Sequence, residues 1–343
     1  MKPIELAERG LAPDWIIRRG IRALLRRRLR EERADDPEAQ AERYQVLMDE
    51  LAESAIAIET DAANEQHYEV PAAFYQQVLG YRLKYSSALW PPGVSSLDDA
   101  ETVMLEQTCR NADLTDGQEV LELGCGWGSL TLWMASNYPA SRITAVSNSA
   151  SQRRHIESRA AELGLSNVSV ITCDVNELAL ERQFDRVVSV EMFEHVRNYR
   201  QLLARVAGWM KPDARLFVHI FCHRYLAYPF ETEGDGNWMG KYFFTGGLMP
   251  AADTLLHFAD DVVIERRWLY SGEHYAKTAR AWLDNLDDRS RQVRSVMREA
   301  YGDDDAALWQ QRWRIFFMAC EELFGFERGR QWLVGHFRFR KAG

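Results

Sequence analysis

The chain has 343 residues, 46% of them hydrophobic and 27% charged, so it can bury a sizeable core in one large or two modest globular domains. Its formal net charge of −9 argues against broad nucleic-acid binding, which needs a basic face. No apolar run approaches the roughly 20 residues that span a bilayer, and the N-terminus lacks the pattern of a signal peptide. The five cysteines are scattered without a CxxC pair, so we expect a cytoplasmic protein without a structural metal or disulfide framework.

Residues 1–65 predict a helical extension rich in Ala, Glu and Arg. Within it, residues 15–33 carry many arginines beside an apolar stripe at near-helical spacing. Such a helix could make transient contact with an anionic membrane surface. We favour the other interpretation, in which the stripe docks on the protein and the arginines are solvated or paired with the acidic residues that follow. Residues 66–343 would then form the main domain.

From Gln118 onward, strands alternate with helices. Before that point, Asp99–Arg110 predicts a helix with Val103, Met104 and Thr108 facing inward. Strands are expected at residues 119–124, 143–148, 168–174, 184–193 and 214–223, and helices at 129–138, 149–165 and 199–210. This alternation is typical of βαβ units, so we predict a Rossmann-like α/β fold with a mainly parallel sheet. The aromatic-rich residues 223–343 would add closing strands and insertions around a substrate pocket.

The segment VLELGCGWG, residues 120–128, places a glycine turn between a strand and a helix. Glycines at 124, 126 and 128 let the backbone turn sharply and approach a ligand closely. The spacing differs from the dinucleotide pattern GxGxxG, and the position suits a nucleoside cofactor at the carboxyl ends of the strands. The alternative is a turn that only packs the helix on the strand.

Polar residues follow the next two strands. The amide of Asn148, with Gln152 one helical turn further on, could bond ribose hydroxyls, and Asp174 could accept from an adenine amine. Each residue alone could equally be a helix cap. Their order behind the glycine turn favours an adenosyl ligand.

These motifs, together with longer segments, carry a family resemblance. ELGCGWG, Ser147–Gln152 and the strand end at Asp174 resemble class I S-adenosylmethionine methyltransferases. NEQHYEVPAAFY, LKYSSALW, SVEMFEHVRNY and YFFTGGLMPAADTLL resemble the cyclopropane-fatty-acyl-phospholipid synthase-like family, and within it the coclaurine N-methyltransferase branch. The similarity runs from about Ala63 to the C-terminus.

The resemblance implies a seven-stranded sheet with helices on both faces and S-adenosylmethionine as cofactor, with S-adenosylhomocysteine as product and no metal. By resemblance, the cofactor would contact Tyr85, Ser86, Gly124, Gly126, Asn148, Gln152, Asp174, Val175 and Val190.

Methyl transfer to an amine needs a base, because a protonated amine has no lone pair. If a helical turn begins after the fourth strand, Glu191, Glu194 and His195 share one face. The alternative is a helix N-terminus with acids that the helix dipole favours. The resemblance assigns these three positions to catalysis. We predict His195 as general base, Glu194 as the residue that orients it and Glu191 as the group that binds the substrate nitrogen.

A rival reaction on the same fold is cyclopropanation of an unsaturated acyl chain, in which bound bicarbonate takes the proton. By resemblance, Glu194, His219, Tyr242 and a cysteine would hold that ion, and Ser87 stands at the cysteine position. For His219 and Tyr242, buried structural residues are the alternative. A third interpretation is a non-catalytic protein that binds S-adenosylmethionine.

Aromatic residues cluster at 238–244 and 309–317. They could line a pocket for a flat, hydrophobic amine or form core. We predict a substrate pocket formed by His219, Tyr242, Phe243, Trp313 and Phe316. The sequence thus predicts an N-methyltransferase for a small hydrophobic or aromatic, tetrahydroisoquinoline-like amine. We expect no nucleic-acid partner and leave a homodimer open.

Overall fold

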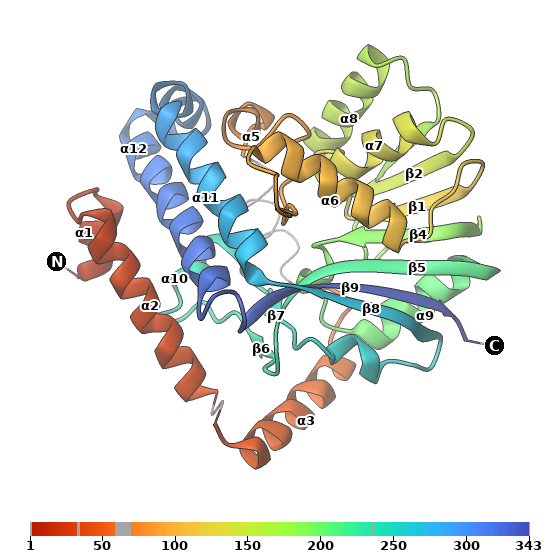
Figure 1. Ribbon diagram of the computed structural model, residues 1–343, viewed down its shortest axis with the longest axis horizontal. Helices are drawn as coiled ribbons and strands as arrows, with labels where there is room; N and C mark the ends of the chain where they lie inside the picture. Colours follow the sequence, from red (N-terminus) through yellow and green to blue (C-terminus); the bar gives the residue numbers. More distant parts are fainter. Residues whose placement is uncertain (1, 33–34, 59–69, 235, 343) are drawn as a thin grey trace.

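The computed structural model describes residues 2–32, 35–58, 70–234 and 236–342 (Figure 1). The helices are α1 (Pro3–Glu8), α2 (Asp14–Glu31), α3 (Pro37–Glu53), α5 (Ala72–Val78), α6 (Leu97–Asn111), α7 (Ser129–Asn137), α8 (Ala150–Glu162), α9 (Tyr199–Trp209), α10 (Trp238–Phe243), α11 (Gly272–Asp288) and α12 (Ser290–Gly325). The strands are β1 (Glu119–Leu123), β2 (Arg142–Ser147), β3 (Val168–Thr172), β4 (Phe184–Val190), β5 (Met210–His223), β6 (Tyr228–Pro229), β7 (Leu248–Met249), β8 (Val262–Tyr270) and β9 (Trp332–Lys341).

Seven strands form one sheet in the order β3-β2-β1-β4-β5-β9-β8. Strands β1 to β5 are parallel, and β9 runs antiparallel to both of its neighbours. The chain winds outward from β1 through β2 and β3 and then returns to β4 on the other side of β1. In such a sheet, a crevice opens at the carboxyl ends of the two strands where the winding reverses. The predicted fold, a mainly parallel seven-stranded sheet with helices on both faces, is confirmed.

Separate cores lie on the two faces of the sheet. On one face, α6 and α7 pack on β1 and β4, and Figure 1 shows α8 on the same side. On the other face, a core joins the same strands to α9, and α3 packs against α9. In α6, Met104, Leu105 and Thr108 are buried while Val103 is only partly buried, so the prediction that Val103 faces inward holds only in part. The residues that face the sheet follow the helical period from 104 and 105 to 108 and 109.

A third, aromatic-rich core joins α2, α5, α11 and α12 beside the carboxyl edge of the sheet. Ile17 of α2 is buried there, and Ile21, Leu25 and Leu29 pack against the same core. Arg18 also forms ion pairs with Glu321 and Glu322 of α12, at 2.7 and 3.0 Å. Most of the apolar stripe of α2 therefore docks on the protein, as we favoured, whereas Ile16 and Leu24 of the same stripe are exposed. Some arginines pair with α12, while Arg28 pairs with Glu32 as the sequence suggested.

None of the helices in the described residues has both the length and the apolar character to cross a membrane.

Candidate active site

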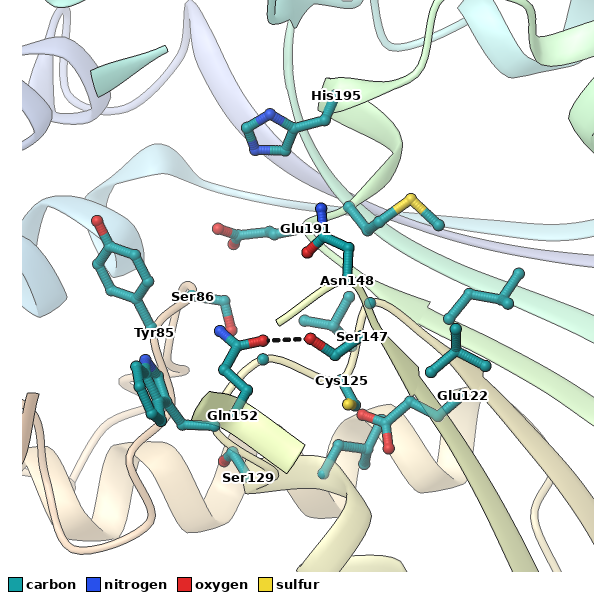
Figure 2. A pocket seen from close by; sticks show the side chains of 18 of the residues that line it. Tyr85, Ser86, Glu122, Cys125, Ser129, Ser147, Asn148, Gln152, Glu191 and His195 are labelled. Atoms are coloured by element: carbon teal, nitrogen blue, oxygen red, sulfur yellow. Dashed lines mark hydrogen bonds between the residues drawn. The ribbon is translucent and has the colours of Figure 1, made fainter. Parts of the chain in front are cut away.

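A pocket opens at the carboxyl ends of β1, β2 and β4, where the sheet topology places the crevice. All nine predicted cofactor-binding residues line it: Tyr85, Ser86, Gly124, Gly126, Asn148, Gln152, Asp174, Val175 and Val190. Figure 2 shows His195 at one end of this pocket and Gln152 with Ser129 toward the other, with Glu191 between them. The site thus combines residues that the sequence separates by more than a hundred positions.

The glycine turn after β1 has the backbone that its sequence predicted. Gly124, Gly126 and Gly128 have φ values of 76°, 52° and 82°, in the left-handed region that favours glycine. A Cβ on Gly124 would lie 2.6 Å from the Met192 side chain, so glycine is needed there for packing. Among the described residues, no heavy atom outside the chain neighbours lies within 4 Å of a Cβ built on Gly126. The turn therefore leaves open space at Gly126, which suits close approach of a ligand.

The ends of β2 and β3 present oriented polar groups to the pocket. Ser147 donates to Oε1 of Gln152 at 2.6 Å, which fixes the direction of the Gln152 amide and of its Nε2 donors (Figure 2). Asp174 accepts from the backbone N–H of Asn176 through Oδ1, at 2.7 Å. Asn176 in turn exchanges hydrogen bonds with the backbone of Ala57, at 3.0 and 3.1 Å. Because Ala57 lines the pocket, the end of the N-terminal segment is fixed against the predicted adenine edge.

Two buried charged residues line the pocket and are absent from the predicted set. Glu122 lies inside β1; burial raises its pKa to about 8, while Thr131 donates to it at 2.6 Å. Burial lowers the pKa of Lys84 to about 8, and its ammonium donates to Ser86 Oγ and to the carbonyl of Ser87. An acid within the apolar run EVLEL was the available signal for Glu122. Nothing local marks Lys84, since its burial depends on distant elements.

Glu191, directly after β4, presents a carboxylate that accepts two hydrogen bonds and contacts a histidine ring nitrogen. Its φ of 47° lies in the left-handed region, a strained conformation for a residue with a side chain. Oε1 accepts from Ser87 N–H at 2.8 Å and contacts His219 Nε2 at 3.1 Å, and Oε2 accepts from the Tyr275 hydroxyl at 2.5 Å. Burial raises the pKa of Glu191, whereas the charge of Lys84 and the hydrogen bonds from Ser87 and Tyr275 oppose that rise.

The expectation that Glu191, Glu194 and His195 share one helical face is wrong. The chain forms only a short 3₁₀ turn, Phe193–His195, and Glu191 precedes it in left-handed geometry. His195 lines the pocket and stacks on Phe244, with ring centroids 4.7 Å apart. Glu194 is fully buried outside the pocket lining, and its Oε1 accepts from Phe221 N–H at 2.7 Å. Its other oxygen has no hydrogen-bond partner among the described residues, and burial raises its pKa well above the ordinary range.

Of the five predicted substrate-pocket residues, Phe316 lines the pocket, and His219, Tyr242, Phe243 and Trp313 lie outside its lining. Phe243 and Trp313 are fully buried, and Phe243 stacks on Phe316 from behind with ring centroids 4.3 Å apart. Tyr242 packs under the Arg312 guanidinium, 4.1 Å from its ring centroid. Phe243 of α10 and Trp313 of α12 thus support the wall from behind, since both pack against Phe316. The aromatic wall itself comes from Tyr85, Phe221, Phe244, Tyr275, Trp282 and Phe316.

The chain is similar to known proteins in sequence and in structure. The family described as mycolic acid cyclopropane synthetase matches residues 57–331. The chain is 37% identical to (S)-coclaurine N-methyltransferase of Thalictrum flavum subsp. glaucum over 345 residues, which covers 99% of this chain and 95% of that relative. It is 28% identical to cyclopropane-fatty-acyl-phospholipid synthase of Escherichia coli (strain K12), over 74% of this chain and 66% of the relative. A crystal structure of coclaurine N-methyltransferase bound to N-methylheliamine and SAH superposes with a TM-score of 0.95 at 35% identity, covering 98% of each chain.

Proposed function

This chain belongs to the mycolic acid cyclopropane synthetase family, and from that membership and the site geometry we propose that it moves a methyl group from S-adenosylmethionine to the nitrogen of a small hydrophobic or aromatic amine. The observation that carries the proposal is one pocket in which the glycine turn and its polar strand ends lie opposite Glu191 and His195 (Figure 2). The full-length similarity to N-methyltransferases supports the same acceptor class.

The described residues fit S-adenosylmethionine. Gly126 leaves open space at the turn, and Gln152 and Asn148 offer amides for ribose hydroxyls. Asp174 offers an acceptor for an adenine amine, with Val175 and Val190 as apolar walls. When bound, the sulfonium group supplies an activated methyl for in-line displacement. The remaining tasks of the protein are to align the acceptor, exclude water and remove a proton.

Glu191 and His195 suit the two tasks at the acceptor. Burial raises the pKa of Glu191, and the Lys84 ammonium and the hydrogen bonds from Ser87 and Tyr275 limit that rise. In the proposal, Glu191 is ionised and its carboxylate attracts a cationic amine. In the proposed mechanism, the imidazole of His195 takes the proton that blocks the nitrogen lone pair, before the methyl is transferred. Aromatic rings of Phe244, Phe316 and Tyr85 would hold a flat, apolar substrate and favour its positive charge. The orienting role of Glu194 stays a prediction.

Cyclopropane chemistry is less well supported by the same geometry. Two groups that the resemblance assigns to bicarbonate, Ser87 and His219, contact the carboxylate of Glu191. Tyr242 and Glu194, the other two, lie outside the pocket lining. The chain's own carboxylate therefore occupies the His219 ring nitrogen and the Ser87 backbone N–H, while the Ser87 hydroxyl donates to the Ala88 carbonyl. A non-catalytic role is also disfavoured, because both Glu191 and His195 line the same pocket as the predicted cofactor-binding residues.

The test is methyl transfer from isotopically labelled S-adenosylmethionine to two acceptors in parallel. We expect a tetrahydroisoquinoline to gain the mass of one CH₂ per transfer, while vesicles of unsaturated phospholipid gain none. Transfer to the lipid with none to the amine would contradict the proposal and favour cyclopropane chemistry. Tight cofactor binding without transfer to either acceptor would favour the non-catalytic interpretation. Cytoplasmic residence, a homodimer and membrane contact through α2 stay predictions from the sequence.

A further inference from the structure

Behind Glu191, a row of buried polar side chains crosses the sheet. His219 of β5 and His336 of β9 are register partners, and both are completely buried. His219 contacts Glu191 Oε1 through Nε2 at 3.1 Å and His336 Nε2 through Nδ1 at 2.9 Å. His336 Nδ1 lies 2.9 Å from the side-chain amide of Asn111, which also donates to the Tyr270 hydroxyl at 2.9 Å. Four side chains from β5, β9, α6 and β8 thus support the carboxylate at the acceptor end of the pocket.

The direction of every hydrogen bond in this row follows from its outer end. Arginine can only donate, and Arg110 contacts Oε1 of Gln107 at 3.4 Å, so the Gln107 amide donates to Asn111 Oδ1 at 2.8 Å. The Asn111 amide nitrogen must therefore donate to His336 Nδ1. A neutral His336 then carries its proton on Nε2 and donates to His219 Nδ1, which places the proton of His219 on Nε2, facing Glu191.

Burial favours neutral imidazoles at both positions. It lowers the pKa of His219 and of His336 well below the ordinary value, and the nearby Lys84 charge acts in the same direction. Each ring therefore has one donor and one acceptor nitrogen, as the row requires.

We propose that His336 is a positioning residue for methyl transfer, because it fixes His219 as an Nε2–H donor and thereby holds Glu191 as an anionic acceptor for the substrate amine. This inference rests on the proposed function only in the role it gives Glu191. The fixed donor matters because His219 in its Nδ1–H form would present a bare Nε2, to which a protonated Glu191 could donate a hydrogen bond, and the neutral acid would then be stabilised. The His336 Nε2–H points at His219 Nδ1 and blocks that arrangement.

This row of hydrogen bonds fixes the orientation of its side chains and gives no path for proton transfer. A chain that carried a proton away from Glu191 would need each member both to accept and to pass one on. The Asn111 amide nitrogen donates to both His336 and Tyr270 and cannot accept a proton. A proton could therefore not pass beyond His336. The proton released by the amine leaves by another route, which the proposal assigns to His195.

Other groups also set the charge of Glu191 and limit the size of the effect. Lys84 from the α5–α6 connection favours the carboxylate through its charge. Tyr275 of α11 donates to it, whereas burial and the neighbouring carboxylate of Glu194 disfavour ionisation. Burial and the charge of Glu191 also raise the pKa of the Cys320 thiol of α12. Removing the His336 donor should therefore shift the protonation of Glu191 without abolishing its ionisation.

The experiment combines ¹⁵N-histidine NMR with kinetics on two substitutions. In the full-length protein, we expect two imidazoles that keep the neutral Nε2–H form from acid to alkaline pH. The signals of His336 should be absent from both His336 variants, and the signals of His219 should change in His336→Phe and stay close to native in His336→Gln. His336→Gln keeps an amide donor toward His219, whereas His336→Phe keeps ring shape without a donor. His223→Gln, on the same strand as His219 but outside the row, is the control; its Nδ1 accepts from the backbone of Tyr225 and Leu226.

We expect His336→Phe to lower kcat/KM for the amine about tenfold, through a higher KM, and to move the acid limb of the profile to higher pH. The direction follows because Glu191 without its fixed donor is protonated at higher pH. His336→Gln should keep the native profile, and S-adenosylmethionine binding should change in neither. An Nδ1–H form at either position in the unsubstituted protein would overturn the proposal, whether or not any amine is methylated. Equal loss in both variants with an unchanged pH profile would also overturn it, since packing alone would then explain the effect.

Discussion

The cofactor half and the acceptor half of the pocket are built in different ways. The cofactor half uses mainly backbone turns and polar residues at the ends of β1, β2 and β3, within one stretch of the chain, and Tyr85, Ser86 and Val190 complete it. The acceptor half joins Glu191 and His195 to side chains from α11, α12 and the α5–α6 connection. Local sequence patterns specify the first half, whereas long-range packing assembles the second. Substitutions should therefore separate cofactor binding from acceptor chemistry.

Removing the proposed base should have the largest effect. We expect His195→Ala to lower kcat roughly 100- to 10,000-fold, the usual contribution of a positioned acid–base group, with little change in S-adenosylmethionine affinity. His257→Ala, at a histidine outside the pocket lining, is the control. Measuring kcat alongside calorimetric cofactor binding checks this. An active His195→Ala enzyme would remove the assigned role and with it the acceptor half as we describe it.

Neutralising Glu191 should have the second-largest effect on activity. Glu191→Gln places an amide against donors from Ser87, His219 and Tyr275, so it loses the charge and disturbs the hydrogen bonds together. We expect kcat/KM for the amine to fall roughly 10- to 100-fold, the range for charge-assisted hydrogen bonds, while cofactor binding stays close to native. Steady-state kinetics at saturating cofactor would measure this fall in kcat/KM. Loss of cofactor binding instead would mean that the two halves are not separable at this residue.

A substitution in the glycine turn should weaken cofactor binding, which the two substitutions above should leave close to native. Gly126→Ala puts a methyl group into the open space at the turn and strains a backbone with φ of 52°. We expect weaker S-adenosylmethionine binding and a loss of roughly 1–2 kcal/mol in stability. Gly164→Ala is a matched control, since Gly164 has φ of 68° and lies outside the pocket lining. If both variants bind the cofactor equally, the open space at Gly126 has no role in binding.

The smallest expected effect is a pH dependence of stability from Glu122. Its folded-state pKa, raised to about 8 by burial, lies above the ordinary value of 4.5, so its contribution is fully present below pH 4.5 and is lost as pH rises toward 8. Glu122→Gln resembles the protonated form and should escape this loss. The difference in Tm between variant and native protein, measured without cofactor, should therefore grow by a few degrees between about pH 5.5 and about pH 8.5. A constant difference would show that Glu122 does not titrate in this range.

The fold and the cofactor half could largely be predicted from the sequence. Alternation of apolar strands with helices gave the parallel part of the sheet, and polar residues at strand ends meet because parallel strands end at one edge. The helix predicted over 199–210 ends one residue earlier, at Trp209, because Met210 pairs with Phe184 and begins β5.

The acceptor half could be predicted only in part. Glu191 and His195 follow a strand, so the sequence could place them at the end of the sheet. The left-handed backbone at Glu191, which no local pattern predicts, breaks the helical face and leaves Glu194 outside the pocket lining. Tyr275 and Lys84 reach the site from distant elements. Phe243 and Trp313 show the converse limit: an aromatic run has the same pattern whether it lines a pocket or supports its wall.

A crystal structure with S-adenosylhomocysteine and an N-methylated tetrahydroisoquinoline would test the central claim most directly. The account predicts the nucleoside along Gly126, Asn148 and Asp174, with the product nitrogen within about 3.2 Å of the Glu191 carboxylate or the His195 imidazole, hydrogen-bonding range for a catalytic group. A nitrogen held elsewhere in the pocket, with both side chains turned away from it, would contradict the account.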